Sequence, residues 1–356
     1  MAGTQREGEG AGETYVTVSD RRYFVGTVAL LNSLRLTGNQ GRLLIVDSGL
    51  TDDQRAELEP HAQLIRLSTE DRATHPFMQK ALVHRHGVEG VLVFVDGDII
   101  VTGSLEEPIA HAGAGKVFAF PDHQSAQQRF FPEWRSVFRL RSPLRRQTYV
   151  NAGFVAFSTE HHPSLLQRWE KAASAIDPGT IMDHDHGHPT WAGDQDALNA
   201  LLMSEVPSER VVIGAHDQEI YWDAVTESRV DNAASLRVGY QDGAALLLHH
   251  AMSPKVWERR AWRRVREDDV YLQLMPRLLY ADDLTVRLRG HRHAPWIRPG
   301  RRGKAALLAL GGANTLAGLI TRRDTATVRR QLARLARRLP PSLLVYAMAT
   351  PELLKV

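Results

Sequence analysis

The feature that most constrains the fold of this chain is an alternation of short β-branched or apolar runs with segments of helical spacing. Thr14–Val18 is predicted to be a strand, and Val25–Leu36 follows it with apolar residues at the spacing of a helix. Two more short strands, Arg42–Val46 and Gln63–Leu67, flank a helix that begins at Asp52. Such alternation predicts an α/β fold with a mostly parallel central sheet and helices on its faces.

The run Gly90–Val95 (GVLVFV) is wholly apolar, which suits a central strand buried on both faces. Asp96 and Asp98 follow it in FVDGDIIV, at the carboxyl end of the strand, where open α/β sheets bind ligands. Further predicted elements are a helix at Met78–Val83, a strand at Gly153–Phe157, helices at Pro163–Ile176 and Asp194–Met203, and a late strand at Ala244–His249.

Length and composition are those of a globular protein with one large domain and an appendage. The chain has 356 residues, of which 43% are hydrophobic and 24% charged. We expect a disordered polar lead-in at residues 1–13 without the apolar stretch of a signal peptide, an α/β domain at 14–260, and a helical, arginine-rich extension at 261–356. The absence of cysteine excludes disulfides and thiol chemistry and favours a cytoplasmic protein.

Basic charge is concentrated toward the end of the chain. From Val256 onward there are 21 Lys and Arg residues against 8 Asp and Glu residues, whereas the preceding part has 23 against 33. The amphipathic pattern at Val328–Leu339 fits a helix packed on the domain or one that touches a membrane surface. Ala305–Ile320 is too short and too rich in glycine to be a transmembrane helix. No motif typical of nucleic-acid binding accompanies the charge, so we expect no nucleic-acid partner.

The two aspartates offer hard oxygen ligands to a divalent cation and leave coordination positions for phosphate oxygens. Asp-Gly-Asp also occurs in ordinary turns, so the tripeptide alone leaves both interpretations open.

The sequence around this tripeptide, FVDGDIIVTGSLEE, resembles the Asp-X-Asp block of glycosyltransferase family 8, which includes glycogenin-like and lipopolysaccharide galactosyltransferase-like enzymes. Other blocks resemble that family in the same order, over about residues 14–260: TVSDRRYFVGTVALLNSL at 17–34, NAG at 151–153, DQDALN at 194–199 and HHAMSPKVW at 249–257. The resemblance implies a GT-A-type nucleotide-sugar-binding domain, a UDP-sugar donor and a bound metal ion.

By this resemblance, Asp20 contacts the uracil and Tyr23 is the aromatic residue beside it. The other interpretation is a helix cap and a core aromatic. Lys80 stands sixteen positions before Asp96, where the family carries a basic residue near the donor, and Arg85 is the fallback candidate.

The resemblance assigns Asn151 and Asp194 to hydrogen bonds with the donor sugar, and Gln195 to the face of the anomeric carbon opposite the leaving group. DQDALN is also a good helix N-terminus with acids in its first turn, and both interpretations can hold together. The histidine-rich stretch 184–188 precedes this block, and we expect a loop near the acceptor there rather than a metal site.

The last block implies that His249 completes a metal site with Asp96 and Asp98, since it lies six residues before Lys255, which would neutralise the diphosphate. An imidazole ligand favours Mn²⁺ over Mg²⁺. His250 is the alternative ligand. This block departs from the family at Met252 and Val256, which makes the path of its loop less certain.

The function that the resemblance implies is transfer of a hexose from a UDP-sugar to an unidentified acceptor, with retention of configuration as in the family. Because Gln195 is a poor nucleophile, we expect the acceptor to attack on the face of the leaving group. A sugar nucleotidyltransferase is the alternative enzyme, although no glycine-rich basic loop is present at Asp20–Gly26. A non-catalytic nucleotide-sugar-binding protein is the alternative from another class.

Overall fold

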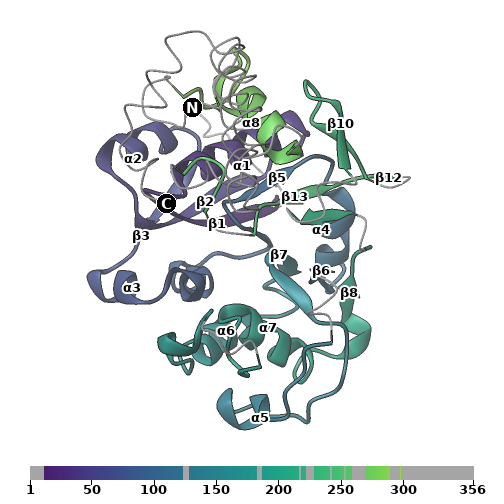
Figure 1. Cartoon of the computed structure of the whole chain (residues 1–356). Coiled ribbons are helices and arrows are strands. Elements are labelled where there is room, and N and C mark those ends of the chain that lie inside the picture. The colour runs from purple at the N-terminus through teal and green to yellow at the C-terminus, as the bar shows by residue number, and fades with distance from the viewer. Residues whose placement is uncertain are drawn as a thin grey trace, which may run out of the picture.

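The structure is a computed structural model that describes residues 12–122, 128–182, 187–215, 218–221, 228–240, 243–251, 254–258, 269–288 and 297. Its central sheet is built from seven strands: β1 (Thr14–Asp20), β2 (Arg42–Gly49), β3 (Gln63–Arg66), β4 (Val91–Val95), β6 (Val117–Pro121), β7 (Val150–Ser158) and β8 (Val211–Ile213). Their order across the sheet is β3-β2-β1-β4-β7-β6-β8 (Figure 1).

The sheet is parallel except for one strand. β1 pairs in parallel with β2 and β4, and the pairs β2–β3 and β6–β8 are parallel as well. Only β7 runs antiparallel, between β4 and β6, with Val95 opposite Phe154 and Pro121 opposite Val150. The start of β7 therefore lies at the same edge as the ends of β1, β4 and β6, so polar residues from four strands meet there.

Both faces of the sheet are covered. Along β4, Leu92 and Phe94 belong to one buried cluster and Val93 and Val95 to the other, as the alternation of side chains in a strand requires. One cluster includes residues of α1 (Phe24–Leu36), α2 (Asp52–Leu58), α4 (Glu106–Gly113) and α8 (Val270–Tyr280). The other includes residues of the 3-10 helix η1 (Pro76–His86) and of α5 (Trp134–Val137), α6 (Leu165–Ala173) and α7 (Asp194–Leu202). Figure 1 shows the resulting three layers.

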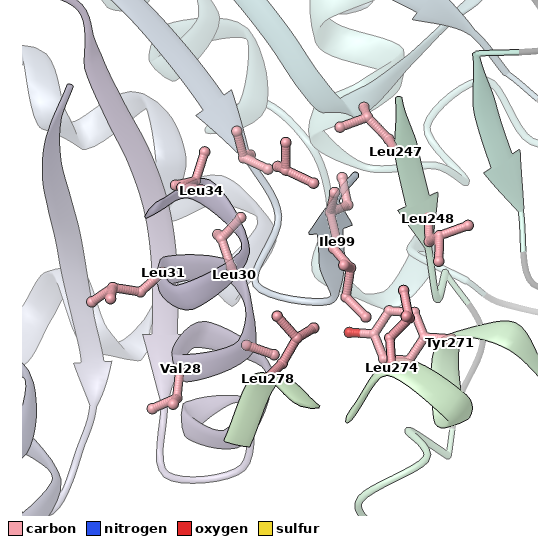
Figure 2. Packing of buried hydrophobic residues seen from close by; sticks show 14 of the residues in the cluster. Val28, Leu30, Leu31, Leu34, Ile99, Leu247, Leu248, Tyr271, Leu274 and Leu278 are labelled. Atoms are coloured by element: carbon pink, nitrogen blue, oxygen red, sulfur yellow. The ribbon is translucent and has the colours of Figure 1, made fainter. Parts of the chain in front are cut away.

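Helix α8 packs against α1 in this core, although it comes late in the chain. Leu278 of α8 lies beside α1, and Leu274 lies next to Tyr271 on the side of Ile99 (Figure 2). Asn32 of α1 is fully buried, and its amide donates hydrogen bonds of 2.7 Å to the carbonyl oxygens of Leu278 and Val286. The side-chain oxygen Oδ1 of Asn32 accepts a hydrogen bond from the backbone N–H of Val286 at 3.0 Å. Because a buried amide needs such partners, Asn32 fixes the position of this segment on the domain.

Two small three-stranded sheets accompany the main one. The first has the order β5-β13-β9, built from β5 (Ile99–Val101), β13 (Leu247–His249) and β9 (Glu219–Tyr221). The second contains β10 (Ser228–Asn232), β11 (Arg237–Tyr240) and β12 (Gly243–Ala244). Three short elements complete the described secondary structure: α3 (Thr69–Ala73), η2 (Pro178–Thr180) and η3 (Ser208–Arg210).

The predicted α/β class with a mostly parallel sheet is confirmed. Two local predictions need correction. The helix expected at Met78–Val83 is a 3-10 helix, and the single strand expected at Ala244–His249 is split into β12 and β13. In the split strand, Ala245 donates to the carbonyl oxygen of Val238 and Leu246 to that of Gln218, so the two halves serve different sheets.

Several predictions about the ends of the chain lie outside the described residues: the lead-in before residue 12, Ala305–Ile320 and Val328–Leu339. The division at residue 260 stays a prediction, although α8 shows that residues beyond it contribute to the core. Within the described ranges, no helix is both long enough and apolar enough to cross a bilayer.

Candidate functional site

The acidic pair occupies a tight turn between β4 and β5. Asp96 donates its backbone N–H to the carbonyl oxygen of Gly153 at 2.8 Å, and Ile99 closes the turn by donating to the carbonyl oxygen of Asp96 at 3.0 Å. The start of α1 packs directly on this turn: a Cβ atom on Gly26 would lie 2.1 Å from the carbonyl oxygen of Gly97. Glycine at position 26 therefore allows an approach that any side chain would prevent.

His249 reaches the acidic pair through strand pairing. In the antiparallel pair of β13 with β5, His249 lies opposite Ile99, the residue that follows Asp98. Its Nε2 atom is 3.6 Å from Oδ1 of Asp98. Gly153 makes room for this arrangement, since a Cβ there would be 2.7 Å from Cε1 of His249 and 3.3 Å from Oδ2 of Asp96.

These three residues suit a divalent cation. One possible ligand atom from each of Asp96, Asp98 and His249 lies within 4.8 Å of the others. Asp98 is buried, and its Oδ1 atom has no hydrogen-bond partner in the described part of the chain. An unpartnered carboxylate oxygen facing an imidazole in a buried site is costly, and a metal ion would satisfy it. Two carboxylate oxygens and one imidazole nitrogen form a ligand set that suits Mn²⁺.

Two buried lysines contact the other oxygens of the carboxylates. Lys80 Nζ lies 2.7 Å from Oδ1 of Asp96, and Lys255 Nζ lies 2.5 Å from Oδ2 of Asp98. Burial raises the pKa of Asp98, but the positive charge of Lys255 and then His249 outweigh it and hold that pKa below its ordinary value. Burial likewise lowers the pKa of Lys80, but the charge of Asp96 and then Asp194 outweighs it and raises that pKa.

The beginning of α7 supplies a second group of polar side chains. Asp194 is buried, and its Oδ2 atom lies 3.6 Å from Lys80 Nζ. Burial raises the pKa of Asp194 to about 7, with Lys80 opposing the shift and Asp96 adding to it. The preceding residue, Gly193, has a φ of +62°, a conformation that favours glycine and lets α7 begin at Asp194.

Gln195 has a fixed amide orientation. Its Oε1 atom accepts from the backbone N–H of Ala152 at 3.0 Å, and its Nε2 atom donates to Oδ2 of Asp122 at 2.7 Å. Asn151 donates to the other oxygen of Asp122 at 3.3 Å. Asp122 therefore joins two of the predicted sugar-binding residues.

The remaining residues of the DQDALN block have structural roles. Asp196 is fully buried and accepts hydrogen bonds from Arg129 at 2.7 and 2.9 Å, from the Tyr149 hydroxyl at 2.8 Å and from the Ala192 backbone at 2.7 Å. Asn199 bonds both backbone groups of Val150, at 2.8 and 2.7 Å. These contacts fix the start of β7 against α7, and so set the position of Gln195 relative to Asn151.

The predicted uridine-binding turn lies at the end of β1, beside the acidic pair. Oδ1 of Asp20 accepts from the backbone N–H groups of Arg22 and Tyr23, both at 2.8 Å, which orders this turn. Lys255 Nζ is 5.4 Å from the centroid of the Tyr23 ring. The Trp257 indole packs edge-on against Tyr23 and donates to the carbonyl oxygen of Arg22 at 2.7 Å. The segment that carries Lys255 is thereby attached to the start of α1.

Arg85 and His250, the alternatives to Lys80 and His249, have other partners. Arg85 is paired with Asp71 and Glu170, and its side chain is 46% exposed. The His250 ring packs against Tyr271, with 5.4 Å between ring centroids, and its backbone N–H donates to the carbonyl oxygen of Asp98 at 3.0 Å. In the histidine-rich stretch, 184–186 lie outside the described residues, and His188 contacts Thr190 at 3.0 Å.

Sequence reasoning missed Asp122. The signal was present, because VFAFP is an apolar run with an acid directly after it, as at Asp96. Without the strand order, however, nothing indicated that β6 ends beside β4 and β7.

Sequence comparison identifies no family, since no family model and no curated protein matches this chain. Solved structures do match in fold. An active-site mutant of LgtC, a galactosyltransferase, is 13% identical, with a TM-score of 0.50 over 76% of this chain and 98% of LgtC. The bifunctional glycosyltransferase WbbM is 14% identical, with a TM-score of 0.51 over 79% of this chain and 51% of WbbM. This chain thus spans about half the length of WbbM, and its fold is that of GT-A glycosyltransferases with a candidate Asp-Asp-His metal site.

Proposed function

We propose that this protein is a metal-dependent glycosyltransferase of the family 8 type, which transfers a hexose from a UDP-sugar to an acceptor with retention of anomeric configuration. The observation that carries the proposal is the convergence of Asp96, Asp98 and His249, whose ligand atoms lie within 4.8 Å of one another although His249 comes 151 positions after Asp98. An acidic turn alone is weak evidence for a metal site. An imidazole that a separate strand brings to the same turn supports a metal site formed by the fold.

Asp96, Asp98 and His249 would hold Mn²⁺ or Mg²⁺, which when bound stabilises the negative charge that develops on a departing diphosphate. Lys255 lies 2.5 Å from Asp98 and 5.4 Å from the Tyr23 ring, between the metal ligands and the proposed uracil site. Its ammonium group is thus suited to bind a phosphate oxygen of the donor. Asp20 and Tyr23 would contact the uracil, in keeping with their place at the carboxyl end of β1.

The donor sugar would lie against Asn151, Asp194 and Gln195. The Gln195 amide is a weak nucleophile, and both its ends are already hydrogen bonded, to Ala152 and Asp122. This favours attack by the acceptor hydroxyl on the same face as the leaving group, with the departing phosphate oxygen receiving the acceptor's proton. The C1–oxygen bond to UDP breaks, the bond to the acceptor oxygen forms, and configuration at C1 is retained.

The test begins with binding and proceeds to turnover. Thermal-shift measurements with UDP-, GDP- and dTDP-sugars, with and without Mn²⁺, should show the largest stabilisation with one UDP-sugar and Mn²⁺. UDP release from that donor, with water as acceptor, then separates the proposed enzyme from a non-catalytic binder, which would bind but release nothing. A sugar nucleotidyltransferase would instead release pyrophosphate from a nucleoside triphosphate and a sugar phosphate.

Retention is tested separately, once an acceptor supports transfer. NMR of the product formed from an α-linked donor should show an α-linkage, and a β-linkage would reject the retaining route. The acceptor class stays open among glycans, lipid-linked sugars, proteins and small metabolites. We also propose a cytoplasmic location with peripheral contact to an anionic membrane through the basic segment 261–356, which vesicle co-sedimentation of the full chain would test.

A further inference from the structure

The two lysines of the site are bonded to the acidic pair in the same way. Lys80 Nζ contacts Oδ1 of Asp96 and donates to the carbonyl oxygen of Ala152 at 3.0 Å. Lys255 Nζ contacts Oδ2 of Asp98 and donates to the carbonyl oxygen of His250 at 2.7 Å. Each ammonium group is thus held by one carboxylate and one backbone carbonyl oxygen, and Lys80 Nζ also lies 3.6 Å from Oδ2 of Asp194. The lysine side chains are only 8% and 3% exposed, so water screens these pairs little.

This bonding leaves one oxygen of each carboxylate for another ligand. Oδ1 of Asp98 has no hydrogen bond and lies 3.6 Å from Nε2 of His249. Oδ2 of Asp96 lies on the His249 side as well, since both would contact a Cβ placed on Gly153. A carboxylate whose second oxygen is held by a lysine loses rotational freedom, and this fixes the direction of the first.

The lysines also cancel charge. The ammonium groups of Lys80 and Lys255 offset the charges of Asp96 and Asp98. Asp194 also lies 3.6 Å from Lys80 Nζ, so the one-to-one balance holds most strictly for the pair of Lys255 and Asp98. A divalent cation is then attracted by the free oxygens but repelled by two ammonium groups close by. In a weakly screened site this repulsion is substantial. A nucleotide diphosphate changes the balance, because its negative oxygens attract the cation and both lysines.

We propose that Lys80 and Lys255 are positioning residues that direct one oxygen of Asp96 and one of Asp98 toward His249 and offset their charge, so that the protein binds a divalent cation weakly alone and strongly together with a nucleoside diphosphate. This inference rests on the proposed function, since it takes the same site as the place where the donor's diphosphate binds. Phosphate oxygens that complete the coordination of the cation already couple the binding of the two ligands. What the inference adds is the role of the two lysines, which strengthen this coupling by weakening cation binding in the absence of the nucleotide.

The experiment measures Mn²⁺ binding to the full-length protein by isothermal titration calorimetry, without UDP and with saturating UDP. For the wild type, UDP should tighten Mn²⁺ binding by at least about tenfold. In Lys255→Met, Mn²⁺ alone should bind about tenfold more tightly than to the wild type, and the effect of UDP should shrink. Lys255→Arg keeps the positive charge, so its Mn²⁺ affinity without UDP should stay as low as that of the wild type. Lys171→Met removes an exposed lysine of α6 and should change neither value.

The melting temperature of Lys255→Met shows whether this variant is folded, so a folding defect can be told apart from a change in Mn²⁺ binding. Lys255→Met leaves the Asp98 carboxylate without its ammonium partner, so the melting temperature should fall without metal and recover when Mn²⁺ is added. Unchanged or weaker Mn²⁺ binding in the folded Lys255→Met variant would overturn the inference, as would equal Mn²⁺ affinity of the wild type with and without UDP. If the wild type bound neither Mn²⁺ nor UDP, the proposed function itself would be rejected.

Discussion

His249 lies opposite Ile99 in the antiparallel pairing of β13 with β5. This pairing brings the imidazole to Asp98, the residue before Ile99, and the contact between Nε2 and Oδ1 measures 3.6 Å. Register therefore matters here: a slip of one residue in β13 would turn His249 to the opposite face of its sheet, away from the acidic pair. The metal site depends on a short strand pair outside the main sheet.

Asp98→Asn should abolish the thermal stabilisation by Mn²⁺ and reduce UDP release to background. The substitution keeps the size of the side chain but replaces an anionic ligand with a neutral amide. Differential scanning fluorimetry with and without Mn²⁺, followed by the UDP-release assay, checks both effects. Glu57→Gln, at an exposed position of α2, is the matched control and should behave as the wild type. Normal turnover of the Asp98 variant would reject the site assignment.

Asp194→Ala should reduce kcat far more than it weakens UDP binding, because the residue is proposed to contact the sugar and not the nucleotide. Steady-state kinetics and a UDP titration of the same preparation provide the two numbers. A variant with normal kcat and weak UDP binding would move Asp194 from the sugar site to the nucleotide site.

In the absence of divalent cations, the free energy of unfolding should fall as pH rises from about 4 to about 7, because of Asp194. Burial raises the pKa of this carboxyl to about 7, from the 3.8 of an exposed side chain. In that interval the folded protein holds a proton that the unfolded chain has lost, so unfolding becomes easier as pH rises. Asp194→Asn cannot titrate and should lack this contribution, which is on the order of a few kcal/mol. Urea unfolding at pH 5 and pH 8 tests it, and an equal pH dependence in both proteins would contradict the assigned shift.

Asp122→Asn should lower kcat by roughly 10- to 100-fold while UDP binding stays nearly normal, since small displacements of positioned groups have effects of that size. Gln195 and Asn151 donate to different oxygens of Asp122, at 2.7 and 3.3 Å. Asparagine keeps only one of these oxygens, so one of the two donors would face an amide nitrogen and lose its hydrogen bond. Kinetics with the preferred donor, together with a UDP titration, separate the two effects. Unchanged kcat would show that the orientation of Gln195 is set without Asp122.

Gly26→Ala should destabilise the protein by about 1–3 kcal/mol and weaken Mn²⁺ binding, because its Cβ would lie 2.1 Å from the carbonyl oxygen of Gly97 and 2.6 Å from the Trp257 ring. Urea unfolding and Mn²⁺ titration measure these effects. Gly113→Ala is the matched control: nothing lies within 4 Å of its Cβ position, so the stability of that variant should stay within about 1 kcal/mol of the wild type. Equal stability of the two variants would show that α1 can move away from the acidic turn.

Much of the central fold follows from local pattern. The buried strand that ends before Asp96 is a continuous apolar run, and such a run with covered faces can only occupy the middle of a sheet. The antiparallel direction of β7 was not predictable in this way, because VNAGFVAFS is equally apolar in either direction and only its neighbours decide how it lies. That direction is what brings Asn151 to the edge where β4 and β6 end.

The sequence by itself determined most of the residues that could serve the site. The two aspartates follow a buried strand, and the other candidates, including a histidine six residues before a lysine, lie in blocks that resemble glycosyltransferase family 8. Only the tertiary structure decided how they meet. The 3.6 Å contact of His249 with Asp98, the two lysine pairs and the link from Asp122 to Gln195 each join segments from different parts of the chain. Such contacts depend on strand order and register, which arise from packing of the whole domain and leave no mark in any one segment.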